Sequence, residues 1–374
     1  CERTFMTSGT TRGDIKGQHH HPDLAVYDAS MLRNFAQQVM RGQARVRMGI
    51  LFPSESVMPH SSLAHYLALA LENFGTPESR YDLNPVYRLA AAPVTATTDP
   101  CIGTRCYGAE LTGLTPGQCG RKLTLGMLDT AVDRRHPALA KARIETRRFD
   151  ASGGAAEDNG HGTAVAALLV GAAASEFPGL LPNARLLAAD VFDLDGEQQP
   201  RTDAVVLARA LDWLLAQRPD AINLSIAGPD GLVLREAVRR VTAAGVPIIA
   251  AAGNAGPDAA PQYPAAYPEA LAVTAIDRFL RIYELASRGE HVALAAPGVG
   301  IWTAGPGGSG LFQDGTSFAA PYVTATVALR RLAEPKQLPG SLFEALRSEA
   351  RDLGPPGRDP IYGAGLAQGA RCPE

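Results

Sequence analysis

The chain has 374 residues, enough for two or three domains and for a large buried core. Lysine and arginine number 35 against 38 aspartates and glutamates, so the formal charge is -3 and bulk basic surface for nucleic acid is lacking. The hydrophobic fraction of 46% and the charged fraction of 20% are typical of a globular protein. We therefore expect a folded protein with no nucleic-acid partner.

Neither membrane-spanning segments nor metal sites are indicated by the sequence. The longest apolar run, residues 163–174, is far shorter than the ~20 residues needed to cross a bilayer. The cysteines are too few for a disulfide scaffold, and their spacing differs from that of paired zinc ligands. They stand at Cys1, Cys101, Cys106, Cys119 and Cys372.

The first residue, Cys1, resembles the lipid-bearing residue of a processed bacterial lipoprotein. Such a residue would tether the protein to a membrane, although a trimmed gene fragment explains it equally well. If the lipoprotein interpretation holds, the compartment is oxidising and a local disulfide between Cys101 and Cys106 is expected. A second pairing, between Cys119 and Cys372, is a weaker expectation.

The first part of the chain predicts a small α+β domain, residues 25–92. It follows a polar, disordered lead-in at 1–24, whose three adjacent histidines read as a solvated tail rather than as a metal site. Apolar periodicity then predicts alternating helices and strands. In chain order these are a helix at 31–40, a strand at 46–52, a helix at 62–74 and an extended segment at 81–89.

A small-residue linker at 90–98 separates this domain from an α/β domain at 121–374, with 93–120 forming the linker and the start of the larger domain. Beyond Lys122, apolar strands alternate with helical stretches, which predicts a parallel sheet flanked by helices. One helix is expected at 203–217 with Asp203 as its cap. The expected strands lie near 123–128, 185–191, 221–225, 246–252, 271–276 and 291–295.

Four residues that can carry chemistry follow strands or open helices of this domain. In parallel α/β sheets the active site lies beyond the carboxyl ends of the strands. Asp129 and Asn254 each follow a predicted strand, whereas His161 and Ser317 stand at helix starts, where the positive helix end favours a developing anion. A carboxylate, an imidazole, a hydroxyl and an amide together suit nucleophilic catalysis.

The chain order Asp, His, Ser and the flanking motifs resemble the subtilisin-like serine peptidases over residues 122–368. The resemblance implies that Asp129, His161 and Ser317 form a catalytic triad and that Asn254 donates to the oxyanion. It also implies polypeptide substrates and no cofactor. The motifs that carry it are 125–130, the helix opened by His161, 222–225, 251–254, 295–298, 315–321 and 362–365.

By the same resemblance, a substrate would lie as a strand between residues 224–228 and the edge near Asp195 and Gly196. This assigns Ser225, Ile226, Ala227 and Gly228 to substrate binding. Ala252 and Gly253, with Ala251, would line the primary pocket together with Ala227 and Gln262. Many relatives carry glycine at the last two positions, so we expect a shortened pocket that favours small side chains.

The segment at 193–196 begins like a calcium loop, but Ala204 occupies the position that needs a bidentate glutamate. We therefore expect a turn there, and calcium lacks a supporting ligand motif. His136 follows a motif that relatives carry as structure and is not expected to be catalytic.

The small domain resembles the inhibitor-type prosegment of these peptidases, which assists folding and blocks the cleft. Slow pairing of distant parallel strands gives a physical reason for such a template. We expect the enzyme to cut itself between Ala90 and Thr98, and to be secreted or held in the bacterial cell envelope or periplasm. Two alternatives stay open: a catalytically silent binding protein with the small domain permanently docked, and a peptidase that matures one dedicated partner.

Overall fold

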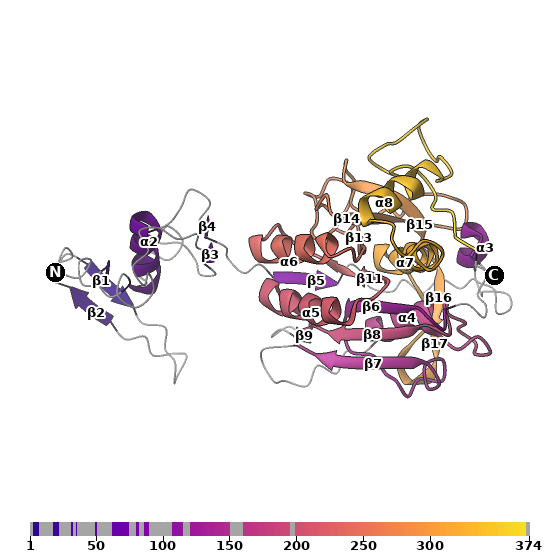
Figure 1. Cartoon of the computed structure of the whole chain (residues 1–374), viewed down its shortest axis with the longest axis horizontal. Helices are drawn as coiled ribbons and strands as arrows, with labels where there is room; N and C mark the ends of the chain where they lie inside the picture. The colour runs from indigo at the N-terminus through magenta and orange to yellow at the C-terminus, as the bar shows by residue number, and fades with distance from the viewer. Residues whose placement is uncertain are drawn as a thin grey trace. The chain divides into compact units, whose positions relative to one another are not determined.

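The structure is a computed structural model that divides into two compact units, Cys1–Pro85 and Val86–Glu374. Figure 1 shows the elements of both. Each unit is treated by itself below. The described residues are 3–6, 18–21, 31–32, 35, 49–50, 62–74, 80–81, 86–89, 107–114, 120–149, 160–194 and 199–371.

Among its described residues, the first unit contains the predicted helix α2 (Ser62–Phe74) and four short strands. The rings of Tyr66 and Phe74 lie 5.8 Å and 5.5 Å from that of Phe35, so the apolar face of α2 is covered. Strand β3 (Gly49–Ile50) pairs in parallel with β4 (Arg80–Tyr81). The predicted helix at 31–40 is seen at Met31, Leu32 and Phe35.

The prediction that residues 1–24 are disordered is wrong for two segments. Strands β1 (Arg3–Met6) and β2 (Gln18–His21) pair antiparallel, with Thr4 opposite His20. Such a ladder is held by backbone hydrogen bonds, which need no apolar pattern in the sequence. The histidines therefore belong to a strand rather than to an unstructured tail.

The second unit is built on a parallel sheet of seven strands in the order β15-β14-β13-β11-β6-β8-β7, so the predicted sheet is confirmed. Strands β6, β8 and β7 can be followed side by side in Figure 1. Sequence analysis missed the edge strand β7. The strands are β6 (Thr124–Asp129), β7 (Arg143–Arg148), β8 (Arg185–Asp190), β11 (Ala221–Leu224), β13 (Ile248–Ala251), β14 (Ala270–Ile276) and β15 (Val292–Pro297).

Helices cover both faces of this sheet and bury two separate hydrophobic clusters. In β13, Ile249 belongs to one cluster and its neighbours Ile248 and Ala250 to the other, and alternate residues of a strand point to opposite faces. Helices α4 (Gly160–Val170) and α7 (Thr316–Ala333) pack in the first cluster. Helices α5 (Ala204–Gln217) and α6 (Leu232–Ala243) pack in the second.

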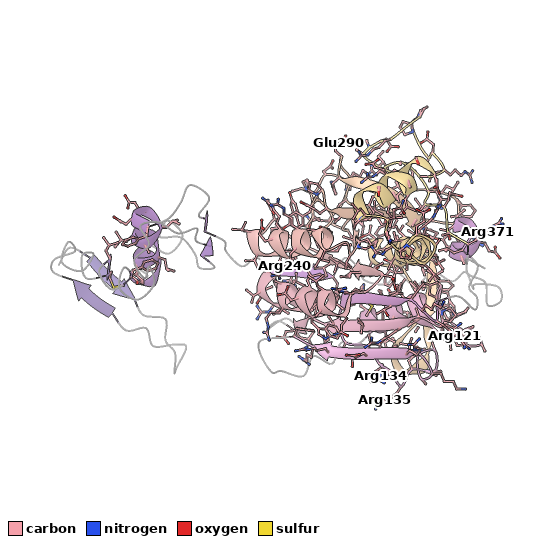
Figure 2. All side chains as sticks on the ribbon, viewed as in Figure 1. Arg121, Arg134, Arg135, Arg240, Glu290 and Arg371 are labelled. Atoms are coloured by element: carbon pink, nitrogen blue, oxygen red, sulfur yellow. The ribbon has the colours of Figure 1, made fainter. Side chains whose placement is uncertain are left out.

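The remaining elements lie around this core. Helices α3 (Tyr107–Thr112) and α8 (Pro339–Ser348) complete the helical layer, and strands β16 (Ile301–Ala304) and β17 (Gly310–Gln313) form a hairpin around the short helix η2 (Pro306–Gly308). Charged side chains such as Arg134, Arg135 and Arg371 lie at the periphery of the unit (Figure 2). These arginine side chains stay in water, while apolar residues fill the two clusters.

A second sheet, ordered β12-β5-β10-β9, corrects two predictions. Strand β5 (Val86–Leu89), which we expected to close the small domain at 25–92, belongs to the larger unit. Strand β9 (Asp193–Leu194) pairs with β10 (Pro200–Asp203) where a turn was expected. Strand β12 is Ile226–Ala227. The pairing of β5 joins segments that are distant in the chain, which leaves little trace in local sequence. β9 has only two residues, too few for an alternating pattern to show.

Several expectations fall outside the described residues. These are the five cysteines, the linker at 90–98, and Asp195 with Gly196. Within the described ranges, no helix is long and apolar enough to cross a membrane. Across those same ranges, no group of three or more histidine, cysteine, aspartate or glutamate side chains could hold a metal ion.

Asp203 caps α5 as predicted, since its Oδ1 accepts hydrogen bonds from the backbone N–H groups of Val205 and Val206 at 2.9 and 3.0 Å. Replacing it by alanine leaves both donors unpaired. We expect Asp203→Ala to lower the free energy of unfolding by about 1 kcal/mol in urea titration, and Asp203→Asn to retain most of it. Equal stability of Asp203→Ala and the unsubstituted chain would contradict this role.

Candidate active site

Asp129, the last residue of β6, is buried and accepts a short hydrogen bond. Its Oδ1 accepts from Nδ1 of His161 at 2.6 Å and from the backbone N–H of Thr130 at 2.8 Å, and the side chain is fully buried. A buried carboxylate needs such partners because losing water is costly. The carboxylate therefore fixes both the orientation of the imidazole and its tautomer, with the proton on Nδ1.

His161 is the second residue of α4 and keeps its other ring nitrogen available. Only 8% of the residue is exposed, and Nε2 is buried without a hydrogen-bond partner among the described residues. With Nδ1 donating to Asp129, Nε2 carries the lone pair. The imidazole is therefore placed as a base whose acceptor atom is ready for a proton.

The start of α4 is held against the end of β6 by close backbone contacts. The N–H of Gly162 donates to Oγ1 of Thr130 at 2.9 Å, and the N–H of Asp133 donates to Oγ1 of Thr163 at 2.8 Å. A Cβ at Gly162 would lie 2.3 Å from the carbonyl oxygen of Thr130. Only glycine permits this approach, so the distance between Asp129 and the imidazole depends on it.

Ser317 is the second residue of α7 and is fully buried. The preceding turn is anchored by the N–H of Gly315, which donates to the carbonyl of Gly298 at 2.8 Å. The ring of Phe318, the next residue, lies 5.3 Å from the imidazole of His161, so the start of α7 adjoins the base. The hydroxyl thus stands at the positive end of an 18-residue helix.

Asn254 follows β13 and has one end of its amide fixed. Its Oδ1 accepts from the backbone N–H of Thr316 at 3.1 Å and from Oγ1 of Thr316 at 3.0 Å. Its Nδ2 is buried and has no partner among the described residues. Because the oxygen is held by the residue before Ser317, the amide N–H₂ is presented beside the serine as an unused donor.

Sequence analysis missed the hydroxyl residues that hold this arrangement. Thr316 both orients Asn254 and accepts from the N–H of Gly253 at 3.1 Å. Farther in, Oγ1 of Thr324 donates to Oδ1 of Asn223, whose Nδ2 donates to Oγ of Ser225, each at 3.0 Å. The sequence signal that could have found Thr316 is its position directly before Ser317. Thr324 and its partner Asn223 lie 101 residues apart, so no local signal joins them.

The predicted substrate-binding residues lie together next to this centre. Ser225 is buried at the end of β11, and Ile226 and Ala227 form β12. Gly228 exchanges two backbone hydrogen bonds with Tyr263, at 3.0 and 2.8 Å. β12 pairs with β5, whose other edge is covered by β10. The edge predicted near Asp195 and Gly196 lies outside the described residues, so that prediction stays open.

The Gln262 side chain narrows the predicted primary pocket. Ala251 and Ala252 are fully buried, and a Cβ at Gly253 would lie 2.8 Å from Cγ of Gln262. The Gln262 side chain is held by its Nε2, which donates to the carbonyl of Ala260 at 2.9 Å. The aliphatic part of the Gln262 side chain thus lies against Gly253, and a glycine at position 262 would leave this space open. The preference for small side chains stays a prediction.

Gly162→Ala tests whether the close approach of α4 to β6 is required. The added methyl group would meet backbone oxygens that cannot move aside, so we expect the free energy of unfolding to fall by about 1–3 kcal/mol. Gly340→Ala is the matched control, since Gly340 lies in α8 with open space around it, and should raise stability by up to about 1 kcal/mol. Equal effects of the two substitutions in urea titration would contradict the account.

Comparisons with known proteins show which family the chain resembles. The model of the subtilase family matches residues 120–365, which is more than half of the chain. Minor extracellular protease Epr of Bacillus subtilis is 30% identical over 255 residues, covering 67% of this chain and 38% of Epr. Subtilisin E of the same organism is 30% identical over 263 residues, covering 67% of this chain and 65% of subtilisin E. The chain thus matches less than two thirds of the length of either relative.

Solved structures show the same likeness. A mutant of the protease domain of PatA superposes with a TM-score of 0.59 at 26% identity, covering 67% of this chain and 93% of that one. The prenylagaramide maturation protease PagA superposes with a TM-score of 0.58 at 27% identity, covering 69% and 94%. With the family model and the seven-stranded parallel sheet, these findings lead to one conclusion: the chain belongs to the subtilase family and has the subtilisin-like α/β fold.

Proposed function

We propose that the chain is a serine endopeptidase that hydrolyses polypeptides through an acyl-enzyme at Ser317. The observation that carries this proposal is the 2.6 Å hydrogen bond from His161 to buried Asp129, which leaves Nε2 of the imidazole without a partner among the described residues. Membership of the subtilase family supports it. The chemistry uses protein groups alone.

In the proposed reaction, Oγ of Ser317 attacks the carbonyl carbon of the scissile bond while Nε2 of His161 takes its proton. The imidazolium that forms is stabilised by Asp129 through Nδ1–H. It then gives the proton to the leaving amine. In the second half of the reaction, water attacks the acyl-enzyme while His161 takes a proton from it, and the carboxylic acid is released from Ser317. Aspartate keeps its charge throughout, because its work is to orient and to stabilise the ring.

The tetrahedral oxyanion would be bound by two donors, Nδ2 of Asn254 and the backbone N–H of Ser317. The amide is already oriented by Thr316, so little reorganisation is needed when charge develops. This preorganisation is the physical source of rate enhancement at such a site.

The chain's own N-terminal part is proposed as its first substrate. We propose that residues 25–92 act as a prosegment and that cleavage falls between Ala90 and Thr98. We also propose a location outside the cytoplasm, either secreted or at the cell envelope. One relative is named an extracellular protease, which supports this location, and another is named an intracellular one.

A narrower function is the maturation of one dedicated partner. The structural likeness to PagA, whose name describes a maturation protease, favours it. The chemistry would be unchanged, and specificity alone would differ. Broad cleavage of casein would count against this narrower function.

Labelling with a fluorophosphonate tests the proposed nucleophile against a silent binding protein. We expect Ser317 to be labelled in enzyme from which the proposed prosegment has been removed, because the reagent needs an activated serine hydroxyl. Ser317→Ala should remain unlabelled and should accumulate as one uncut chain. Absence of labelling, or a two-fragment pattern that persists in Ser317→Ala, would contradict the proposal.

Asn254→Ala tests the oxyanion donor. We expect kcat to fall about 100- to 1000-fold with little change in KM, a magnitude measured in a subtilisin and borrowed from that relative. The donor acts on the transition state more than on bound substrate, so binding should be spared. Thermal unfolding checks that the variant is folded. A kcat that stays within about threefold would exclude this role for Asn254.

A further inference from the structure

A chain of three buried polar side chains joins the helix of the proposed nucleophile to the strand that leads into the predicted substrate-binding residues. Oγ1 of Thr324 in α7 donates to Oδ1 of Asn223 in β11, and Nδ2 of Asn223 donates to Oγ of Ser225, each at 3.0 Å. All three residues are fully buried. Polar groups buried so deeply are stable only when they are paired, and a fully paired network favours one geometry.

Thr324 bonds outside its own helix, unlike its neighbour Thr326. Oγ1 of Thr326 donates to the carbonyl oxygen of Tyr322 at 2.9 Å, which is the usual local bond of a threonine inside a helix. The hydroxyl of Thr324 instead reaches a strand that lies 101 residues earlier in the chain. The bond of Thr324 therefore ties helix to sheet, whereas the bond of Thr326 stays within the helix.

Asn223 and Ser225 lie on the face of the sheet that α7 covers. Leu224, which stands between them in sequence, belongs to the second cluster on the opposite face, and alternate residues of a strand point to opposite faces. Leu224 also pairs with Leu128 of β6, so Ser225 follows at the level of Asp129. The polar network thus ends at the edge of the sheet where the predicted triad carboxylate stands.

The bond from Thr324 to Asn223 limits how α7 can shift along the sheet. Ser317 lies seven residues before Thr324, about 10 Å along the helix axis, and Ser225 lies two residues after Asn223, about 7 Å along the strand. Most of the buried residues of α7 are apolar and belong to the first cluster, and apolar burial is non-directional. A hydrogen bond is directional, so this one selects a single relative position of helix and strand.

We propose that Thr324 and Asn223 are positioning residues for an extended substrate. Their bond aligns the Ser317 hydroxyl with a peptide that lies along residues 225–228, and it therefore determines how far the enzyme favours extended polypeptides over short acyl compounds. This inference rests on the proposed peptidase function. Neither residue touches the reacting atoms, since each acts through the element that carries it.

Two esters with the same leaving group test this alignment in the full chain as expressed. Acetyl-alanine p-nitrophenyl ester presents one residue, whereas acetyl-tetra-alanine p-nitrophenyl ester is long enough to lie along residues 225–228. Thr324→Val removes the hydroxyl and nearly keeps the shape of the side chain. We expect kcat/KM to fall about tenfold or more for the longer ester and to stay within about threefold for the shorter one. The ratio of the two values does not depend on the amount of active enzyme.

Two further variants on the same helix serve as controls. Thr326→Val removes only a local bond, so kcat/KM for both esters should stay within about threefold of the unsubstituted chain. Thr324→Ser restores the hydroxyl and should restore the preference for the longer ester. A general loss of structure would lower both esters alike, which separates it from a loss of alignment.

An equal loss for both esters in Thr324→Val, no loss for either, or an equally selective loss in Thr326→Val overturns the inference and leaves the proposed function standing. The same holds if the unsubstituted chain shows no preference for the longer ester. If the unsubstituted chain hydrolyses neither ester, the inference and the proposed function both fail.

A double variant decides the matter if Thr324→Val does not fold. Thr324→Val combined with Asn223→Leu replaces both partners of the bond by apolar side chains, which avoids a buried partner left unpaired and costs little stability. We expect this variant to unfold close to the temperature of the unsubstituted chain and to show the same selective loss for the longer ester. Unchanged selectivity in the double variant would overturn the inference.

Discussion

One buried hydrogen bond, from His161 to Asp129, governs the rest of the site. Burying a carboxylate is unfavourable unless donors replace the lost water, and here an imidazole and a backbone N–H do so at one oxygen. The consequence is chemical, because the ring is held with its acceptor nitrogen away from the carboxylate. Every contact that brings α4 to the end of β6, above all at Gly162, serves this bond.

The nucleophile is positioned by the core itself. Helix α7 is buried along nearly its whole length, from Thr316 to Leu329, and packs against β11, β13, β14 and β15. A helix buried in this way has no freedom to shift without opening the core, since protein interiors are close-packed. The hydroxyl of Ser317 and the amide fixed by Thr316 are thereby placed with the same rigidity as the hydrophobic residues behind them.

Much of this could be predicted from sequence, and the failures have physical causes. Buried strands such as β6 and β13 are apolar on both faces and stand out as runs, whereas the edge strand β7 carries exposed arginines and does not. Motif residues at strand and helix ends indicated Asp129, His161, Ser317 and Asn254. The pairing of β5 with β10 and β12 joins segments over 100 residues apart, and local sequence carries no record of it.

The tautomer of His161 tests the central claim most directly. The chain has eight histidines, and ¹⁵N labelling of all of them, with His161→Asn to identify the signal, makes the ring nitrogens observable by NMR at neutral pH. The account predicts a protonated Nδ1 with a far-downfield proton, an unprotonated Nε2, and loss of that proton signal in Asp129→Ala. A ring protonated at Nε2 alone, unaffected by removal of the carboxylate, would contradict it.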